Sequence, residues 1–188
     1  MIVGAASYPG LAIINKLSIS GTEHLKDLPR EKVLFVSNHQ TYFADVITFY
    51  HVFCSVKWGF RNRVLPIALF APRARTFYVA ASETMKSGFI PKIFSLAGAI
   101  LVERSWRAEG KNVKRELDTS AGDNVKKGLD FGWVVSFPQG TTSPYAPIRK
   151  GTAHIIKENN PIVVPVVINC FRRAFNKTGL GYKKRNTI

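Results

Sequence analysis

The sequence has few acidic residues and few cysteines, and both shortages narrow what the protein can do. Its 188 residues include 12 Asp and Glu against 27 Lys and Arg, which gives a formal net charge of +15. A balance this basic favours an anionic partner, such as nucleic acid, an anionic lipid surface or a phosphorylated small molecule. Its two cysteines, Cys54 and Cys170, lie in apolar stretches. We therefore expect no disulfide framework and a reducing compartment.

Long apolar runs and several common catalytic motifs are also missing. No stretch of about 18 apolar residues could cross a bilayer. The apolar segments 1–14 and 46–56 are shorter, and each is compatible with core packing or with contact to a membrane surface. The chain has no GxSxG, GxxxxGKS or GxxxxGKT, GxGxxG, CxxC or HExxH motif. These absences argue against a covalent serine hydrolase, a P-loop nucleotidase and a zinc enzyme, and we expect no metal site.

What the sequence does contain is a series of short apolar runs separated by helical patterns. The runs predict buried strands at 33–37, 77–81, 99–102, 133–137 and 162–168. The segments between them predict helices at 45–53 and 151–157, and along an apolar stripe formed by Val113, Leu117, Ala121, Val125 and Leu129. Strands that alternate with helices predict an α/β fold. We expect a single domain over residues 1–188, with a central, largely parallel sheet flanked by helices.

Polar residues follow the ends of these predicted strands. They are Asn38, His39 and Asp45 after the first strand, Glu103 and Arg104 after the third, and Gln139, Gly140, Thr141, Thr142, Ser143, Arg149 and Lys150 after the fourth. Ligands of an open α/β sheet bind beyond the carboxyl ends of the strands. The convergence of these groups at one sheet edge therefore predicts a site.

The chemistry of these residues suggests proton transfer beside an anion. His39 can take a proton from a hydroxyl near neutral pH, and a carboxylate on its other ring nitrogen would fix its tautomer. Arg104 and Lys150 could hold a phosphate. Gly140 and the hydroxyls of Thr141, Thr142 and Ser143 could add backbone N–H and O–H donors. Purely structural roles are the alternative interpretation of the same residues. A histidine after a strand is often structural, and residues 137–144 are also typical of a plain turn.

Four motifs in order resemble those of the glycerolipid acyltransferases, which include the 1-acyl-glycerol-3-phosphate acyltransferases. That family carries Asn-His-X4-Asp, then Gly-X5-Arg, then Phe-Pro-Glu-Gly-Thr-Arg-Ser, then Val-Pro. The corresponding residues here are Asn38, His39 and Asp45, then Gly98 and Arg104, then Phe137 to Ser143, then Val164 and Pro165. Lys150 and Gly151 match the Lys-Gly that usually follows the third motif. The resemblance covers about residues 17–169.

The resemblance implies an enzyme that needs no cofactor beyond its acyl donor, acyl-CoA or acyl-carrier protein, which is a co-substrate. It implies that His39 is a general base and that Asp45 orients it, without an acyl-enzyme. It implies that Arg104, Gln139, Gly140, Thr141 and Lys150 bind the acceptor. It also implies membrane lipid as a partner, no nucleic acid, and a location on the cytoplasmic face of the inner or plasma membrane.

Three departures from the family pattern bear on the site. Five residues separate His39 from Asp45 where the family has four, and six helical steps would place the two side chains roughly 120° apart. A loop before the helix would restore their contact. We predict that Asp45 is the acid that reaches His39, since Glu31 precedes the strand and the next acid is Glu83. Gln139 replaces Glu and Thr142 replaces Arg, which removes a carboxylate and a cation from the third motif.

Other functions stay open at this point. The missing cation makes a lyso-aminolipid of the glycine or ornithine type an alternative to 1-acyl-glycerol-3-phosphate as acceptor. The basic residues after Glu158, which run from Arg172 to Arg185, suggest a non-enzymatic binding module for a membrane or nucleic acid. A thioester hydrolase, with His39 activating water, is a third class. The abrupt end after residues 179–188 also suggests that the chain is a fragment or has a disordered end.

Overall fold

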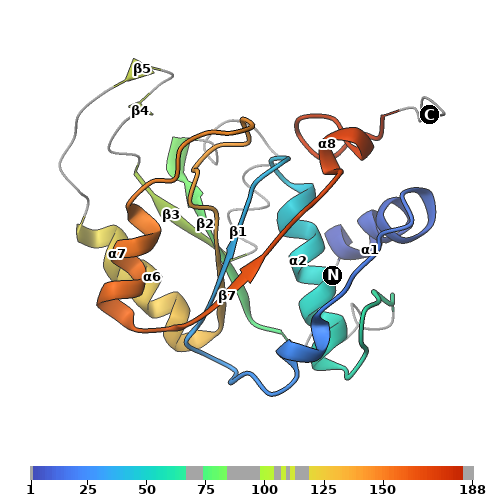
Figure 1. The fold of residues 1–188 in the computed structure, drawn as a ribbon, viewed down its shortest axis with the longest axis horizontal. Coiled ribbons are helices and arrows are strands. Elements are labelled where there is room, and N and C mark those ends of the chain that lie inside the picture. Colours follow the sequence, from blue (N-terminus) through green and yellow to red (C-terminus); the bar gives the residue numbers. More distant parts are fainter. Residues whose placement is uncertain are drawn as a thin grey trace.

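The fold is a five-stranded, all-parallel sheet flanked by helices (Figure 1). The structure, a computed structural model, describes residues 2–66, 74–83, 98–103, 107–108, 111–112 and 119–183. The strands follow the order β3-β2-β6-β1-β7 across the sheet. Their bounds are Val33–Ser37 for β1, Thr76–Ala81 for β2, Ala99–Val102 for β3, Trp133–Ser136 for β6 and Ile162–Val166 for β7.

Helices cover both faces of the sheet. Helices α1 and α2 lie on one side of it, and α6 and α7 lie on the other (Figure 1). The helix bounds are Ile2–Tyr8 for α1, Ala44–Lys57 for α2, Thr119–Phe131 for α6, Gly151–Asn159 for α7 and Phe171–Ala174 for α8. The remaining elements are a π-helix η1 (Pro9–Ile14), a 3-10 helix η2 (Thr22–Leu25) and a short antiparallel pair, β4 (Arg107–Ala108) and β5 (Lys111–Asn112).

The predicted α/β architecture is confirmed, but two strands end earlier than the apolar runs do. Strand β6 stops at Ser136 because the Phe137 carbonyl accepts the Gly140 N–H of a turn, at 2.9 Å. Strand β7 stops at Val166, and the backbone of Ile168 pairs with a side chain instead. The predicted helices match α2, α6 and α7, while positions 113 and 117 of the apolar stripe lie outside the described residues.

Alternation along the central strands builds two core layers. Val33 and Phe35 of β1 face the α2 side, where Phe35 stacks near Phe53 with ring centroids 4.4 Å apart. Leu34 of β1 faces the other side, where it packs with Val125 and Leu129 of α6. Side chains on a strand point alternately to opposite faces, so a doubly covered strand is apolar at every position. This burial fixes β1, and hence the residues that follow it.

The apolar N-terminal segment has mixed burial. Leu11 is buried in the core on the α2 side, whereas Ile13 and Ile14 are exposed. Core packing therefore holds for Leu11, while contact of this segment with a membrane surface stays a prediction. In the part of the chain that the structure describes, no helix combines the length and apolar character needed to cross a membrane.

Candidate active site

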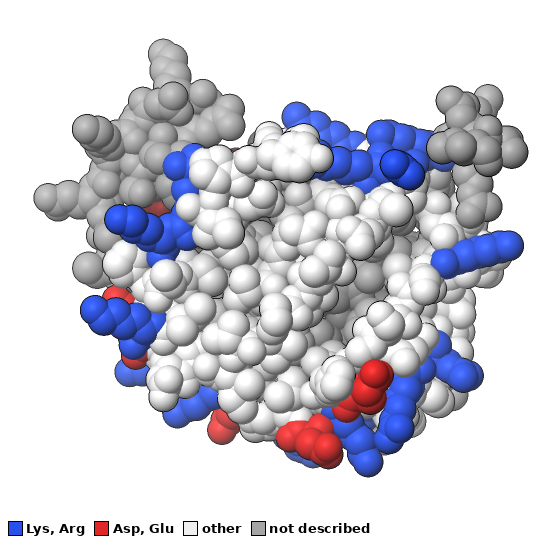
Figure 2. Space-filling model, viewed as in Figure 1, with Lys and Arg blue, Asp and Glu red and all other residues white. Residues whose placement is uncertain are grey.

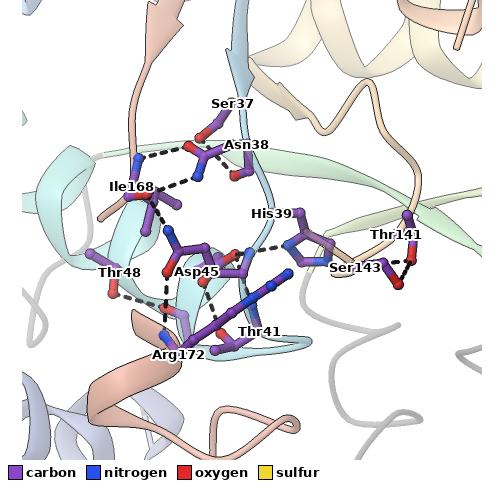
Figure 3. Close-up of polar contacts among 12 residues, drawn as sticks. Ser37, Asn38, His39, Thr41, Asp45, Thr48, Thr141, Ser143, Ile168 and Arg172 are labelled. Carbon is purple, nitrogen blue, oxygen red and sulfur yellow. Dashed lines mark hydrogen bonds and ion pairs between the residues drawn. The ribbon is translucent and has the colours of Figure 1, made fainter. Parts of the chain in front are cut away.

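The centre of the site is a contact between His39 and Asp45 at the carboxyl end of β1 (Figure 3). His39 Nδ1 lies 2.9 Å from Asp45 Oδ2. Asp45 is fully buried, and the His39 side chain keeps 15% of its surface exposed. A carboxylate only accepts hydrogen bonds, so this contact places the proton on Nδ1 and leaves the lone pair on Nε2. None of the described residues bonds to Nε2, which is free to meet a substrate.

Asp45 is held by donors on both oxygens. Its Oδ2 also accepts the backbone N–H groups of Gln40 at 2.6 Å and Thr41 at 3.2 Å, and its Oδ1 accepts the Thr41 hydroxyl at 2.8 Å. Four hydrogen bonds satisfy a carboxylate that has no access to water. They also fix its position, so the imidazole ring of His39 has one defined orientation.

A loop before α2 explains how the unusual spacing still produces this contact. Residues 38–43 are irregular, and α2 begins at Ala44, so Asp45 lies in the first turn of the helix while His39 lies outside it. An acid is favoured at that place by the partial positive charge of a helix N-terminus. The His39 ring stacks on the Phe137 ring, with centroids 4.1 Å apart, and this contact supports one face of the imidazole. The predicted contact between His39 and Asp45 is therefore present.

Two amide side chains tie this loop to the chain that follows β7. The Asn38 amide donates to the Ile168 carbonyl, and its oxygen accepts the Ile168 N–H, both at 2.8 Å. Gln40 Nε2 donates to the same carbonyl at 2.6 Å, and Gln40 Oε1 accepts the Arg172 N–H at 3.2 Å. The residues on either side of His39 therefore position it and connect it to α8.

The chain after α8 covers the same loop. The carbonyls of Lys177 and Thr178 accept the N–H groups of Tyr42 and Phe43 at 3.1 and 2.9 Å. Gly179, with φ +82, approaches so closely that a Cβ there would lie 2.5 Å from the Ala44 nitrogen. Only glycine combines a positive φ with this close approach. Residues well beyond β7 are thus part of the framework of the site.

The loop after β6 holds most of the other predicted site residues, and its own contacts shape it. The Gln139 amide donates to the Ala146 carbonyl at 3.0 Å, which a carboxylate at this position could not do. Gly140 has φ +62 and closes the turn with Phe137. The Thr141 hydroxyl lies 3.3 Å from that of Ser143. Lys150 is exposed and directly precedes α7. Arg104 lies outside the described residues.

A cavity of about 270 Å³ adjoins the loop after β1: Gln40 lines it, and its neighbour His39 and Asp45 do not. Its lining includes the polar residues Gln40, Thr142 and Ser143 and the basic residues Arg172, Lys177 and Lys183. Predicted acceptor-binding residues Gln139, Gly140, Thr141 and Lys150 do not line it. In the described ranges, no three His, Cys, Asp or Glu side chains are grouped as metal ligands would be.

Thr142 and Ser143 were among the polar residues predicted to converge on the site, whereas the basic lining residues Arg172, Lys177 and Lys183 were not, although the sequence held a partial signal. The run of basic residues after Glu158 marks a local charge, but it does not say where that charge lies in space. Arg172 is 132 residues from Gln40 in sequence, and the hydrogen bond between them joins the two segments only in the folded chain.

Comparison with known proteins agrees with the motifs. The family model described as Acyltransferase matches residues 16–169 of the 188, which is most of the chain. No curated protein and no solved structure matches the chain. The matched region contains His39, Asp45 and the loop after β6, and it ends just before α8. The sheet, the histidine and aspartate beyond β1 and the family match lead to one conclusion: the chain belongs to the glycerolipid acyltransferase family.

Proposed function

We propose that the protein is an O-acyltransferase of membrane lipid synthesis. It moves a fatty acyl group from acyl-CoA or acyl-carrier protein to the hydroxyl of a lysophospholipid, with 1-acyl-glycerol-3-phosphate as the preferred acceptor. The observation that carries this proposal is the contact between His39 and Asp45, with Nε2 left open, in a chain of the acyltransferase family. The acyl thioester is a co-substrate, and the proposal needs no other cofactor.

The geometry supports direct transfer with His39 as general base. Nε2 takes the proton of the acceptor hydroxyl as its oxygen attacks the thioester carbonyl carbon, and a C–O bond forms. The C–S bond then breaks, and the leaving thiolate takes the proton back from the imidazolium. Asp45 stabilises the imidazolium and keeps Nδ1 protonated throughout. No acyl-enzyme forms in this scheme.

The charge distribution supports a location at a membrane. The net charge is +15, and in the view of Figure 2 Lys and Arg side chains occur around much of the rim, with one group at the edge that carries α8. Clusters of basic residues close to a membrane surface are attracted to the anionic lipids of the cytoplasmic leaflet. They also attract an acidic acyl donor. We place the protein on the cytoplasmic face of the inner or plasma membrane, where its lipid acceptor lies.

Acyl transfer by the purified protein in detergent tests the proposal. Wild type, His39→Ala and His24→Ala are each given a labelled acyl-CoA. The acceptor is either 1-acyl-glycerol-3-phosphate (lysophosphatidic acid) or a lyso-glycine lipid. His24 is exposed and serves as the matched control. We expect transfer to lysophosphatidic acid, and a loss of about 100-fold or more in His39→Ala alone, since a general base contributes about 10² to 10⁴.

Three results would contradict parts of this proposal. Transfer that survives in His39→Ala would remove the general-base role. Acyl release that does not depend on an acceptor alcohol would make the protein a thioester hydrolase. Faster transfer to the lyso-glycine lipid than to lysophosphatidic acid would replace the acceptor. If acyl-CoA is inert, acyl-carrier protein is tested in the same format.

A further inference from the structure

We propose that the cavity lined by Arg172 and by Gln40, the residue after His39, binds the anionic headgroup of the acceptor as a phosphomonoester, and that Arg172 is its main ligand. The inference rests on the proposed function and deepens it, because it assigns a binding residue outside the region that the family model matches. Arg172 belongs to α8, which follows the last strand of the sheet.

The first argument is the position of Arg172 relative to the reacting group. Its backbone N–H bonds to the side chain of Gln40, the residue that directly follows His39. In Figure 3 the Arg172 side chain extends from α8 toward His39, with its guanidinium group at the near end. An anion bound there would lie beside the histidine, as a headgroup must when its own glycerol hydroxyl is the nucleophile.

The second argument is the charge of the lining. Arg172, Lys177 and Lys183 bring three cations to one cavity, and no described carboxylate pairs with them. The two lysines have other contacts: Lys183 Nζ donates to the Arg172 carbonyl at 2.6 Å, and Lys177 Nζ lies 5.8 Å from the centre of the Tyr42 ring. No described residue bonds to the guanidinium group of Arg172, which therefore remains available for a ligand.

The third argument is the chemistry of the uncharged lining residues and the size of the cavity. Thr142 and Ser143 contribute hydroxyl groups, and Gln40 contributes an amide. A guanidinium fork binds two oxygens of one phosphate, and hydroxyls donate to a third. A volume of about 270 Å³ lies below the range of about 300–1,000 Å³ of sites that enclose drug-sized ligands. That volume suits a phosphorylated headgroup.

Binding of glycerol 3-phosphate, followed by phosphorus NMR of the ligand, tests this assignment without any acyl transfer. The proteins are wild type, Arg172→Ala, Arg172→Lys and Arg173→Ala. Arg173 is the neighbouring exposed arginine and does not line the cavity, so it controls for net charge. Loss of a charged hydrogen-bond partner should weaken binding about tenfold or more in Arg172→Ala. Arg172→Lys should be intermediate, and Arg173→Ala should match wild type. Circular dichroism confirms that each variant is folded.

Equal weakening in Arg172→Ala and Arg173→Ala would show general charge attraction and overturn the assignment. Tighter binding of N-acetylglycine than of glycerol 3-phosphate would replace the phosphate by a carboxylate and also overturn it. In the transfer assay, Arg172→Ala should raise the KM for lysophosphatidic acid about tenfold and leave the KM for acyl-CoA unchanged. A rise in the KM for acyl-CoA alone would assign the cavity to the donor instead.

These readouts separate the two proposals. Phosphate binding that is lost only in Arg172→Ala, in a protein that transfers no acyl group, would support the binding site and refute the acyltransferase proposal. Acyl transfer that requires His39 and is unchanged in Arg172→Ala would support the acyltransferase proposal and refute the binding role of Arg172.

Discussion

Asp45 carries the strongest single-residue prediction, because its role depends on accepting hydrogen bonds. An amide at this position keeps the shape of the side chain but presents an NH₂ group to one of its four donors. It can also donate to Nδ1 of His39 and so move the ring proton to Nε2. We expect Asp45→Asn to lower kcat for acyl transfer by about 10² to 10⁴, by analogy with the same change in other carboxylate-oriented histidines.

The same variant should also unfold more easily. A buried donor left without an acceptor costs about 1 to 3 kcal/mol, measured as the free energy of unfolding in urea. Asp130→Asn, an exposed position on α6, is the control for both measurements. A normal rate of transfer in Asp45→Asn would show that the carboxylate does not set the tautomer of His39.

The pairing of His39 with Asp45 could be predicted from the sequence by elimination, since few acids lie near the first strand. Its geometry could not, because the sequence does not say where α2 begins. A helix that began a turn earlier would have kept the two side chains apart. Arg172 could not be assigned at all, since its contact with Gln40 depends on the path of the chain after β7.

At the scale of elements, the packing of α1 against α2 contains a pH-sensitive contact. His51 of α2 is buried, and its Nε2 lies 2.9 Å from the Ser7 hydroxyl of α1. Its Nδ1 has no hydrogen-bond partner among the described residues. Burial lowers the pKa of His51 from 6.5 to about 4. The folded protein therefore binds this proton less readily than the unfolded chain does.

The sign of the effect follows from this difference in pKa. Stability from the neutral His51 is fully present above pH 6.5 and is lost as pH falls toward 4, because the unfolded chain is protonated first. Between pH 7 and pH 5, we expect the free energy of unfolding in urea to fall by about 2 kcal/mol more in wild type than in His51→Leu. Parallel losses in the two proteins would show that another group dominates in this range.

Most strands and helices could be predicted because the two core layers leave a simple pattern. A strand that is covered on both faces is apolar along most of its length, as β1 and β6 are up to the serine that ends each of them. The ends of β6 and β7 were misplaced because apolar residues continue past the last ladder hydrogen bond. Phe137 is apolar because it stacks on His39, and the backbone of Ile168 is bonded by Asn38. Both positions serve the site and not the sheet.

At the scale of the whole molecule, the site is assembled from three distant parts of the chain. The loop after β1 supplies His39, the loop after β6 supplies hydroxyls, and α8 with the residues that follow it supplies cations. The parallel sheet brings the carboxyl ends of β1, β6 and β7 to the same edge, which makes this meeting possible. The same edge carries one of the groups of Lys and Arg side chains seen in Figure 2. Catalysis and attachment to a lipid surface would therefore share one side of the protein.

The loop after β6 also exposes apolar side chains at this edge, which leads to the last prediction. Tyr145 is 100% exposed and Ile148 is 78% exposed, directly before Arg149 and Lys150. Aromatic and aliphatic groups beside cations are suited to the boundary between lipid headgroups and acyl chains. We expect binding to vesicles that contain phosphatidylglycerol to weaken as salt shortens the Debye length from about 10 Å at 0.1 M to about 3 Å at 1 M.

The part of this binding that survives salt should depend on the apolar loop. In a sedimentation assay at high salt, Tyr145→Ser with Ile148→Ser should weaken vesicle binding about tenfold or more, since burial of one large apolar side chain is worth about 1.5 to 3 kcal/mol. Phe131→Ser is the matched control, because Phe131 is 60% exposed but precedes β6 and so lies at the opposite edge of the sheet. If Phe131→Ser weakens binding as much as the loop variant does, the protein has no preferred orientation on the membrane. If only the loop variant does, the edge that holds His39 is the one that faces the lipid, and the acceptor can reach the site without leaving the bilayer.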